Sequence, residues 1–137
     1  MMPEFLLGKA NETAVYEAVL AHLCAAFPDV TVKCDKTQAA FVRQTQFAWV
    51  WLPRTKKDAG KLMVSFALPE RNVVKRMAWV AAQRPGKYVH HVLAASPEEI
   101  DGELKGWLEA AYVFFGSRKG RREVGGGMRN SEFVMRN

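Results

Sequence analysis

The chain has 137 residues and a formal net charge of +6, and 49% of its residues are hydrophobic while 25% are charged. This length suits one domain, and the composition is ordinary for a soluble globular protein whose core needs no disulfide or structural metal. No apolar run approaches the roughly 18 residues of a membrane-spanning helix. The two cysteines are too few for a zinc site, and the N-terminus does not resemble a signal peptide, so a cytoplasmic protein is expected.

The net charge is unevenly distributed along the chain. Residues 54–87 hold nine Lys and Arg against two Asp and Glu, a net charge of +7, and residues 117–137 hold six against two, or +4. Residues 88–116 hold one against five, or −4, and residues 1–53 hold four against five, or −1. Residues before 117 therefore sum to only +2, so the pI of 9.6 is a weaker indication of a nucleic-acid partner than its value suggests.

A first helix is predicted between Asn11 and Pro28. Apolar residues recur there at spacings of one, three and four, which is one face of a helix. Cys24 falls on that face and is expected to be buried, whereas His22 falls on the other face and is expected to be solvated. Asn11 or Thr13 is placed to cap the helix, and Pro28 to end it.

Strands are predicted after this helix. Residues 30–34 alternate as a short strand, and residues 38–52 read as a hairpin of two strands. In the second arm of the hairpin, the alternation predicts that Phe47, Trp49 and Trp51 share one face. Apolar residues on both faces of that arm indicate a strand that is at least partly covered on both sides.

The next two segments are predicted to be a strand and a short helix. Residues 61–69 alternate as a strand. Residues 70–84 contain apolar residues at helical spacing, namely Val73, Val74, Met77 and Val80. That spacing predicts a short helix or helical turn, which a Pro-Gly turn closes.

Two adjacent histidines lie in the last predicted strand, residues 87–95. Neighbouring side chains on a strand point to opposite faces, so His90 and His91 cannot both bind one metal ion. The expectation is that one histidine packs beside the core and the other faces outward.

A second helix is predicted to follow and to end at Gly116. Ser96 and Glu99 have the spacing of a capping box at its start. Asp101 and Lys105 are spaced to form an ion pair on its surface.

Together these elements predict a single α+β domain over residues 1–116. Its antiparallel sheet of about five strands is packed by an N-terminal and a C-terminal helix, an order loosely similar to double-wing and frataxin-like small domains. Residues 117–137 are basic and rich in glycine, and they are expected to form a flexible tail.

Three segments of the chain resemble a known family in the same order. They are "KCDKTQAAFVRQTQFAWVWLPR", "SFALPER" and "RPGKYVHHVLAASPEEIDGELKGWLEAAY", and they are similar to the bacterial domain-of-unknown-function family numbered 5655. The resemblance covers about residues 5–115. It implies a compact α+β fold, and it carries over no catalytic residue.

The first functional hypothesis is a non-catalytic binding or interaction module for an anionic ligand or a protein partner. The candidate ligand-binding residues are Lys36, Thr37, Gln38, Arg54, Arg71 and His90. Lys, Arg, Thr and Gln side chains together suit a phosphate, a carboxylate or a nucleobase edge. For each residue alone, ordinary turn chemistry or a solvated charge is the plainer interpretation. A stacking platform of Trp49 and Trp51 is a further possibility, although aromatic residues on a sheet more often belong to the core.

Two other hypotheses stay open. A nucleic-acid-binding protein would use the basic segment 54–87 and the basic tail, together with Trp49, Trp51 or Trp79 if these rings reach the surface. An enzyme would need a histidine beside Glu99 or Asp101 as an acid–base pair, because the chain lacks the phosphate-cradling, nucleophile-elbow and zinc-protease motifs. No catalytic residue, cofactor or metal site is predicted.

Overall fold

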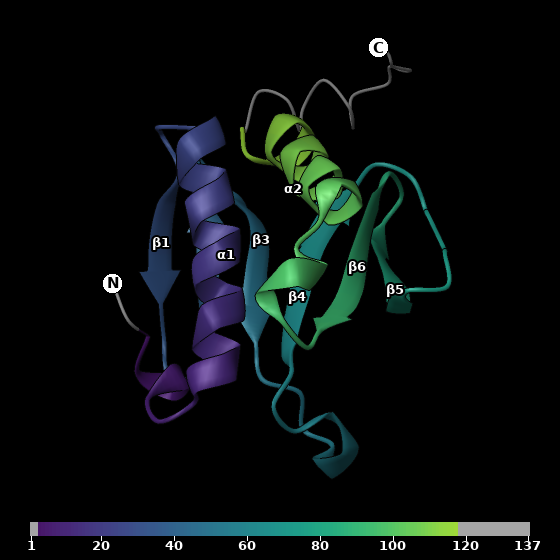
Figure 1. Ribbon diagram of the computed structural model, residues 1–137. Coiled ribbons are helices and arrows are strands. Elements are labelled where there is room, and N and C mark those ends of the chain that lie inside the picture. The colour runs from purple at the N-terminus through teal and green to yellow at the C-terminus, as the bar shows by residue number, and fades with distance from the viewer. Residues whose placement is uncertain (1–2, 118–137) are drawn as a thin grey trace.

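The computed structural model describes residues 3–117 and shows one antiparallel sheet with two helices on the same face (Figure 1). Neighbouring strands follow the order β1-β2-β3-β4-β6-β5 and all pair antiparallel. The helices are α1 (Ala10–Ala26) and α2 (Gly102–Phe115). The strands are β1 (Thr31–Cys34), β2 (Gln38–Val42), β3 (Gln46–Trp51), β4 (Leu62–Leu68), β5 (Met77–Arg84) and β6 (Lys87–Ala94). Short 3-10 turns are η1 (Glu4–Leu6), η2 (Lys56–Asp58) and η3 (Pro97–Glu99).

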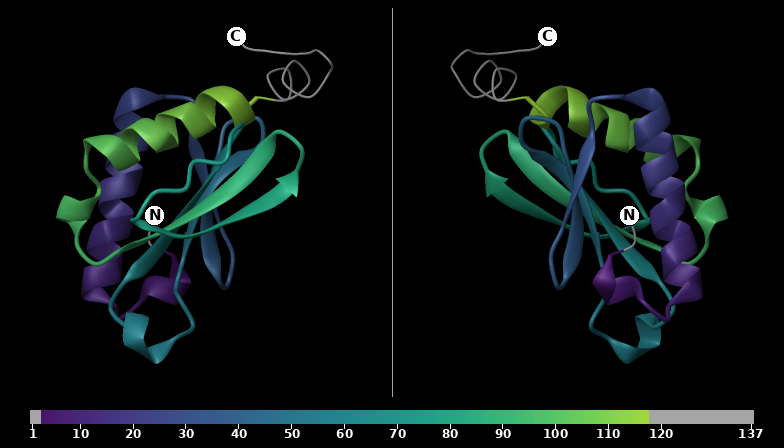
Figure 2. Two further views of the ribbon diagram at one scale, coloured as in Figure 1. Left: turned by 90° about the vertical axis from the view of Figure 1, so that its right-hand side faces the viewer. Right: turned by 90° about the vertical axis from the view of Figure 1, so that its left-hand side faces the viewer.

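This architecture confirms the predicted α+β class, with six strands instead of about five. Side views show both helices on one side of a strongly twisted sheet, so that no helix of residues 3–117 covers the other side (Figure 2). We call that side the open face. The core lies between the helices and the sheet, where α1 contributes Val15 and Val19, and α2 contributes Leu104 and Leu108. All four are fully buried, and burying each such side chain contributes about 1.5–3 kcal/mol.

The extra strand is β5, and the predicted short helix at this position is wrong. β5 pairs with β6 and has an irregularity between Met77 and Trp79, where Ala78 is an extra residue. Because of this bulge, Met77 and Val80 both face the helices although they are three residues apart. A bulged strand therefore produced the spacing that is typical of a helix.

A second bulge corrects the prediction for β3. Phe41 of β2 pairs with Ala48, but the next residue, Val42, pairs with Gln46, so Phe47 is the extra residue. Phe47 consequently lies on the helix side, fully buried and edge-on to the ring of Tyr112. It does not share a face with Trp49 and Trp51.

The predictions for the cap of α1, for Cys24 and for His22 are also wrong. The helix begins at Ala10, and the side chains of Asn11 and Thr13 bind other segments instead of capping it: Asn11 donates to Gly60 and Ala95 carbonyls, each at 2.6 Å. Cys24 is exposed, because the buried stripe ends at Leu23.

The partner of His22 is a residue of the other helix. His22 is only 16% exposed, and its Nε2 lies 3.0 Å from a carboxylate oxygen of Glu109 on α2. It is therefore not solvated as predicted, since the packing of α2 against α1 brings an acid beside it.

The second helix starts later than the capping box predicted. Ser96 precedes η3 and makes no side-chain cap, and the helix begins at Gly102 with Asp101 as its cap, accepting from Leu104 N–H at 3.0 Å. Asp101 pairs with Arg76, whose Nη1 lies 3.0 Å from the carboxylate, and not with Lys105. Arg76 also binds Glu103 at 3.0 Å, so it fastens the β4–β5 connection to the start of α2.

The predicted flexible tail lies outside the described residues, apart from its first residue. Within the part of the chain that the structure describes, no helix combines the length and the apolar character needed to cross a membrane.

The bulge in β3 makes a stability prediction. Replacing Phe47 by Ala removes a fully buried ring from the helix side and should lower the free energy of unfolding by about 3–5 kcal/mol. Val113→Ala, which shortens a side chain 59% exposed on α2, should change it by less than about 0.5 kcal/mol. Urea denaturation of both variants measures the difference. Equal effects would contradict the placement of Phe47 in the core.

Candidate functional site

Strand pairing brings the predicted binding corner next to two tryptophans. β2 begins at Gln38, and its register pairs Gln38 with Trp51 near the end of β3. Just before β2, the Asp35 carboxylate accepts from the backbone N–H groups of Thr37 at 2.8 Å and Gln38 at 2.9 Å. These bonds lower the pKa of Asp35 and fix the turn that holds Lys36 and Thr37 at the edge of the sheet.

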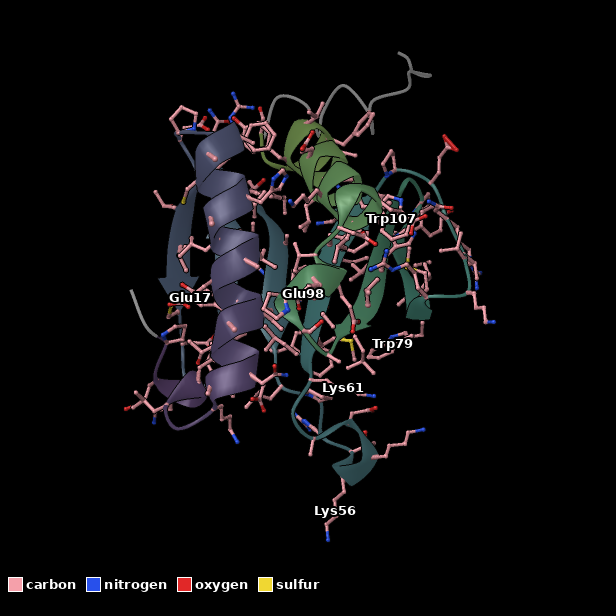
Figure 3. The ribbon with its side chains drawn as sticks, in the orientation of Figure 1. Glu17, Lys56, Lys61, Trp79, Glu98 and Trp107 are labelled. Carbon is pink, nitrogen blue, oxygen red and sulfur yellow. The ribbon has the colours of Figure 1, made fainter. Side chains whose placement is uncertain are left out.

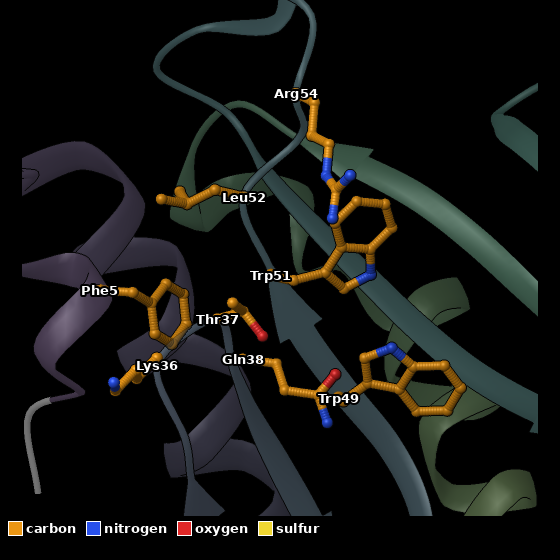
Figure 4. Close-up of a pocket in the computed structure, with 8 residues that line it drawn as sticks. All are labelled: Phe5, Lys36, Thr37, Gln38, Trp49, Trp51, Leu52 and Arg54. Carbon is orange, nitrogen blue, oxygen red and sulfur yellow. The ribbon is translucent and has the colours of Figure 1, made fainter.

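A hollow of about 360 Å³ lies at this corner, a volume within the range of small-molecule sites. Its walls are Phe5, Lys36, Thr37, Gln38, Trp49, Trp51, Leu52 and Arg54. Figure 4 shows Phe5 on one side and the two tryptophans on the other, with the Arg54 guanidinium beside the ring of Trp51. We call this hollow the corner pocket. Four of the six predicted residues line it, namely Lys36, Thr37, Gln38 and Arg54.

The polar groups of the corner pocket are not equally available to a ligand. The Thr37 hydroxyl lies 3.1 Å from the Asp35 carboxylate and is engaged in the turn. The cations of Lys36 and Arg54 therefore supply the charge, and the Gln38 amide supplies both a donor and an acceptor. Aromatic walls beside two cations suit a ligand that combines a planar ring with an anionic group.

The other two predicted residues do not line this pocket. His90 is fully buried on the helix side, stacked on Phe66 with 5.6 Å between ring centroids. Its Nε2 accepts from Asn72 N–H at 3.0 Å and its Nδ1 lies 2.9 Å from the Tyr88 carbonyl. Burial lowers the pKa of His90, and the neighbouring Arg71 charge lowers it further. His90 thus holds the connection between β4 and β5, where Arg71 lies exposed.

The neighbouring histidine, His91, belongs to the open face. The register places Trp49, Ser65, His91 and Trp79 in one row across β3, β4, β6 and β5. The Trp51 Nε1–H donates to Ser65 Oγ at 2.9 Å, and Ser65 Oγ lies 2.7 Å from His91 Nδ1. Trp79 stacks on His91 with 4.0 Å between ring centroids. We call Trp51, Ser65, His91 and Trp79 the open-face cluster.

The Ser65 hydroxyl joins two rings of this cluster. Its Oγ accepts from Trp51 Nε1–H at 2.9 Å and shares a 2.7 Å hydrogen bond with His91 Nδ1. His91 is neutral at pH 7, because its pKa lies well below that pH. Burial is the main reason that the pKa of His91 falls to about 4, and the charge of His90 adds to the effect. Both histidines are buried, so the expectation that one faces outward is wrong.

Sequence reasoning did not select Ser65 or His91 as site residues, and it named Trp79 only as an aromatic residue that would support nucleic-acid binding if it reached the surface. Period-2 alternation does place Trp49 with Trp51 and separates His91 from His90. The row across four strands depends on the register of the strand pairs, however. Because the sequence predicted a helix where β5 lies, it could not place Trp79 in that row.

Within residues 3–117, the predicted acid–base pair of His90 or His91 with Glu99 or Asp101 is not formed. Both nitrogens of His90 have other partners, and the Asp101 carboxylate binds Leu104 N–H and Arg76. Among residues 3–117, no group of three or more His, Cys, Asp or Glu side chains is arranged to hold a metal ion.

The fold and this site define a small α+β domain with a one-sided sheet and a ligand-sized corner pocket. The model of the family described as a domain of unknown function (DUF5655) matches residues 2–114. The chain belongs to this family, as the three segments indicated. No curated protein and no solved structure matches the chain.

The Ser65 hydroxyl should matter for stability although it is a single small group. Ser65→Ala leaves the buried Trp51 N–H and His91 Nδ1 without their partner, which costs about 1–3 kcal/mol. Ser96→Ala is the matched control, because Ser96 makes no cap bond. Chemical denaturation measures both variants, and near-ultraviolet circular dichroism reports the tryptophan environment. A cost no larger than that of Ser96→Ala would contradict the network.

The low pKa of His91 predicts a pH dependence of stability. Its folded pKa of about 4 lies below the ordinary 6.5, so the unfolded chain binds more protons between these values. The free energy of unfolding should therefore fall as the pH drops from 7 to 4, by roughly 3 kcal/mol at most from this group. His91→Gln should flatten part of this slope, and His90 should account for another part. An unchanged slope in His91→Gln would contradict the assignment.

Proposed function

We propose that this domain is a non-catalytic binding module whose corner pocket holds a small anionic ligand that carries a planar ring. The observation that supports this most is the convergence of Lys36, Gln38 and Arg54 around Trp49 and Trp51 in one ligand-sized hollow. The cations would bind a phosphate or carboxylate, and a tryptophan face would stack on the ring.

The physical setting favours an anion at this pocket. None of the six strands contains Asp or Glu, and the charged residues within them are Lys33, Arg84 and Lys87. Two acids are adjacent in sequence to lining residues of the pocket, Glu4 and Asp35, and Asp35 already accepts three hydrogen bonds from Thr37 and Gln38. The same proposal includes a bacterial source, inferred from the family resemblance, and a cytoplasmic location, inferred from the composition.

Nucleic-acid binding by the basic segment 54–87 and the tail is the second candidate. One observation favours it: Arg54, Lys56, Lys57 and Lys61 gather in one loop, where Asp58 is the single acid, and Lys56 extends away from the sheet (Figure 3). Not all of the segment is available, since Arg76 is bound to two carboxylates of the helix side.

Ligand titration followed by tryptophan fluorescence tests the first candidate. A nucleoside monophosphate serves as the planar anionic probe and inorganic phosphate as the ring-free probe. The monophosphate should quench the fluorescence, and Arg54→Gln should weaken its binding by about tenfold or more, as expected for a lost charge-assisted hydrogen bond. Lys105→Gln on α2 removes the same charge from the helix side and should leave binding unchanged.

Two results would overturn this function. One is the absence of monophosphate binding at millimolar concentration, and the other is an equal effect of Arg54→Gln and Lys105→Gln. Trp107→Phe serves as the reporter control, because Trp107 packs on Phe66 on the helix side and should not sense the ligand.

The tail candidate has a separate test. Replacing Arg118, Lys119, Arg121 and Arg122 by Gln in the full chain should abolish binding to a labelled duplex if the tail supplies the affinity. Unchanged anisotropy titrations at physiological salt would remove the tail from consideration.

A further inference from the structure

A second hollow adjoins the corner pocket on the open face. It has a volume of about 390 Å³ and is lined by Trp51, Pro53, Arg54, Thr55, Asp58, Met63 and Trp79. Two residues, Trp51 and Arg54, line both hollows. The two spaces are therefore separated by one aromatic ring and one guanidinium, and we call the second space the strand pocket.

The walls of the strand pocket are aromatic and firmly held. Trp79 stacks on His91, yet it is 46% exposed, so the ring presents accessible surface from a fixed position. Trp51 lies 6.1 Å from Trp79, nearly perpendicular to it, and its Nε1 is bound by Ser65. Met63, only 3% exposed, packs beneath them. Rigid aromatic surface of this kind binds flat rings at a small cost in conformational entropy.

The charges around the two pockets suit a polyanion. Lys36 and Arg54 line the corner pocket, and Lys33 lies in the same cross-strand row as Trp49 through the pairs Lys33–Ala40 and Ala40–Trp49. The one acid of the strand pocket, Asp58, is engaged by the Thr55 hydroxyl at 2.5 Å and lies 3.9 Å from Lys61 Nζ.

The acids of the helices are Glu12, Glu17, Glu103 and Glu109, and none of them lines either pocket. Glu12 lines a neighbouring hollow that also includes Arg54. The corner pocket itself has two cations and no acid among its lining residues.

We propose that the open face binds single-stranded nucleic acid, with one base in the corner pocket, the next base in the strand pocket and the phosphate between them on Arg54. This inference rests on the proposed function and deepens it by naming the ligand class. Two ring-sized spaces that share a cation match the repeat of planar base, anionic phosphate and planar base. Base stacking on aromatic side chains and backbone contacts to basic ones are the ordinary means of single-strand binding.

The test compares ligands of increasing length on the full chain at physiological salt. The probes are a nucleoside monophosphate, a dinucleotide and labelled hexanucleotides of DNA and RNA, together with a duplex of the same sequence. After correction for the number of binding registers, the dinucleotide and the hexanucleotides should bind about tenfold or more tightly than the monophosphate. The duplex should bind at least tenfold more weakly than the single strand, because its bases are paired and stacked.

Variants then separate the two pockets. Trp79→Ala should weaken hexanucleotide binding about fivefold or more and leave monophosphate binding unchanged, since Trp79 lines only the strand pocket. Arg54→Gln should weaken both ligands and reduce the salt dependence of hexanucleotide binding by about one unit of slope. Val113→Ala, an exposed apolar position on α2, is the control that should change neither.

Five outcomes would overturn the proposal. If the monophosphate binds with Arg54 dependence but the longer ligands gain nothing, or if Trp79→Ala has no effect, the strand pocket is not a nucleotide site and the proposed function still stands. If the duplex binds as tightly as the single strand, the affinity is electrostatic only. A homodimer that sedimentation detects and Trp79→Ala disrupts would assign the open face to a second copy. Absence of binding to every probe, by contrast, would remove both the inference and the proposed function.

Discussion

The constraint on which this fold depends is that β4 must be buried on both faces although helices cover only one. All seven residues of β4 are buried. Leu62, Val64 and Phe66 face the helices and belong to the main core. Met63 and Ser65 face the open side, where they are covered by neighbouring side chains of β3, β5 and β6. The small Ser65 side chain leaves room for large rings to lean over it, and its hydroxyl binds two of them.

This solution gives the open-face cluster two roles. Trp51 and Trp79 shield β4 from water, and the same rings form walls of the two pockets. A side chain that shields a central strand cannot move freely, so the walls of the two pockets are held in place by the packing of the sheet. Pre-organisation of this kind would lower the entropic cost of the proposed binding.

The prediction from sequence succeeded where local pattern decides the structure. Alternation and apolar content identified β4 and the β2–β3 hairpin, and the pairing of a hairpin is what joins Gln38 to Trp51 and hence the predicted corner to the tryptophans. It failed at the bulges. One extra residue, Ala78 in β5 or Phe47 in β3, changes the face of the residues beyond it, and no local signal marks the position.

Contacts between distant segments were also beyond local pattern. The Tyr112 hydroxyl donates to Asp29 at 2.7 Å across 83 residues, and Arg43 binds the other oxygen of the same carboxylate at 2.9 Å. Asp101 pairs with Arg76 and not with the predicted partner Lys105. The guanidinium of Arg76 binds the carboxylates of Asp101 and Glu103 and the Glu99 carbonyl at once. Such choices depend on which elements meet in space. For the same reason, His90 and not His91 was selected as a candidate, since the sequence shows that the two diverge but not which of them faces the tryptophans.

Ion pairs on the helix side stabilise the fold and use part of the positive charge of the chain. The ion pair between Arg76 and Asp101 holds the start of α2 in place. The ion pair between Arg43 and Asp29 lies near the other end of that helix. Of these two arginines, Arg76 belongs to the basic segment 54–87, so part of that segment's charge is already paired on the helix side. Arg54 lies instead in the loop after β3, where it lines both the corner pocket and the strand pocket. The binding proposal therefore rests on the position of one arginine beside ordered aromatic rings and not on total charge.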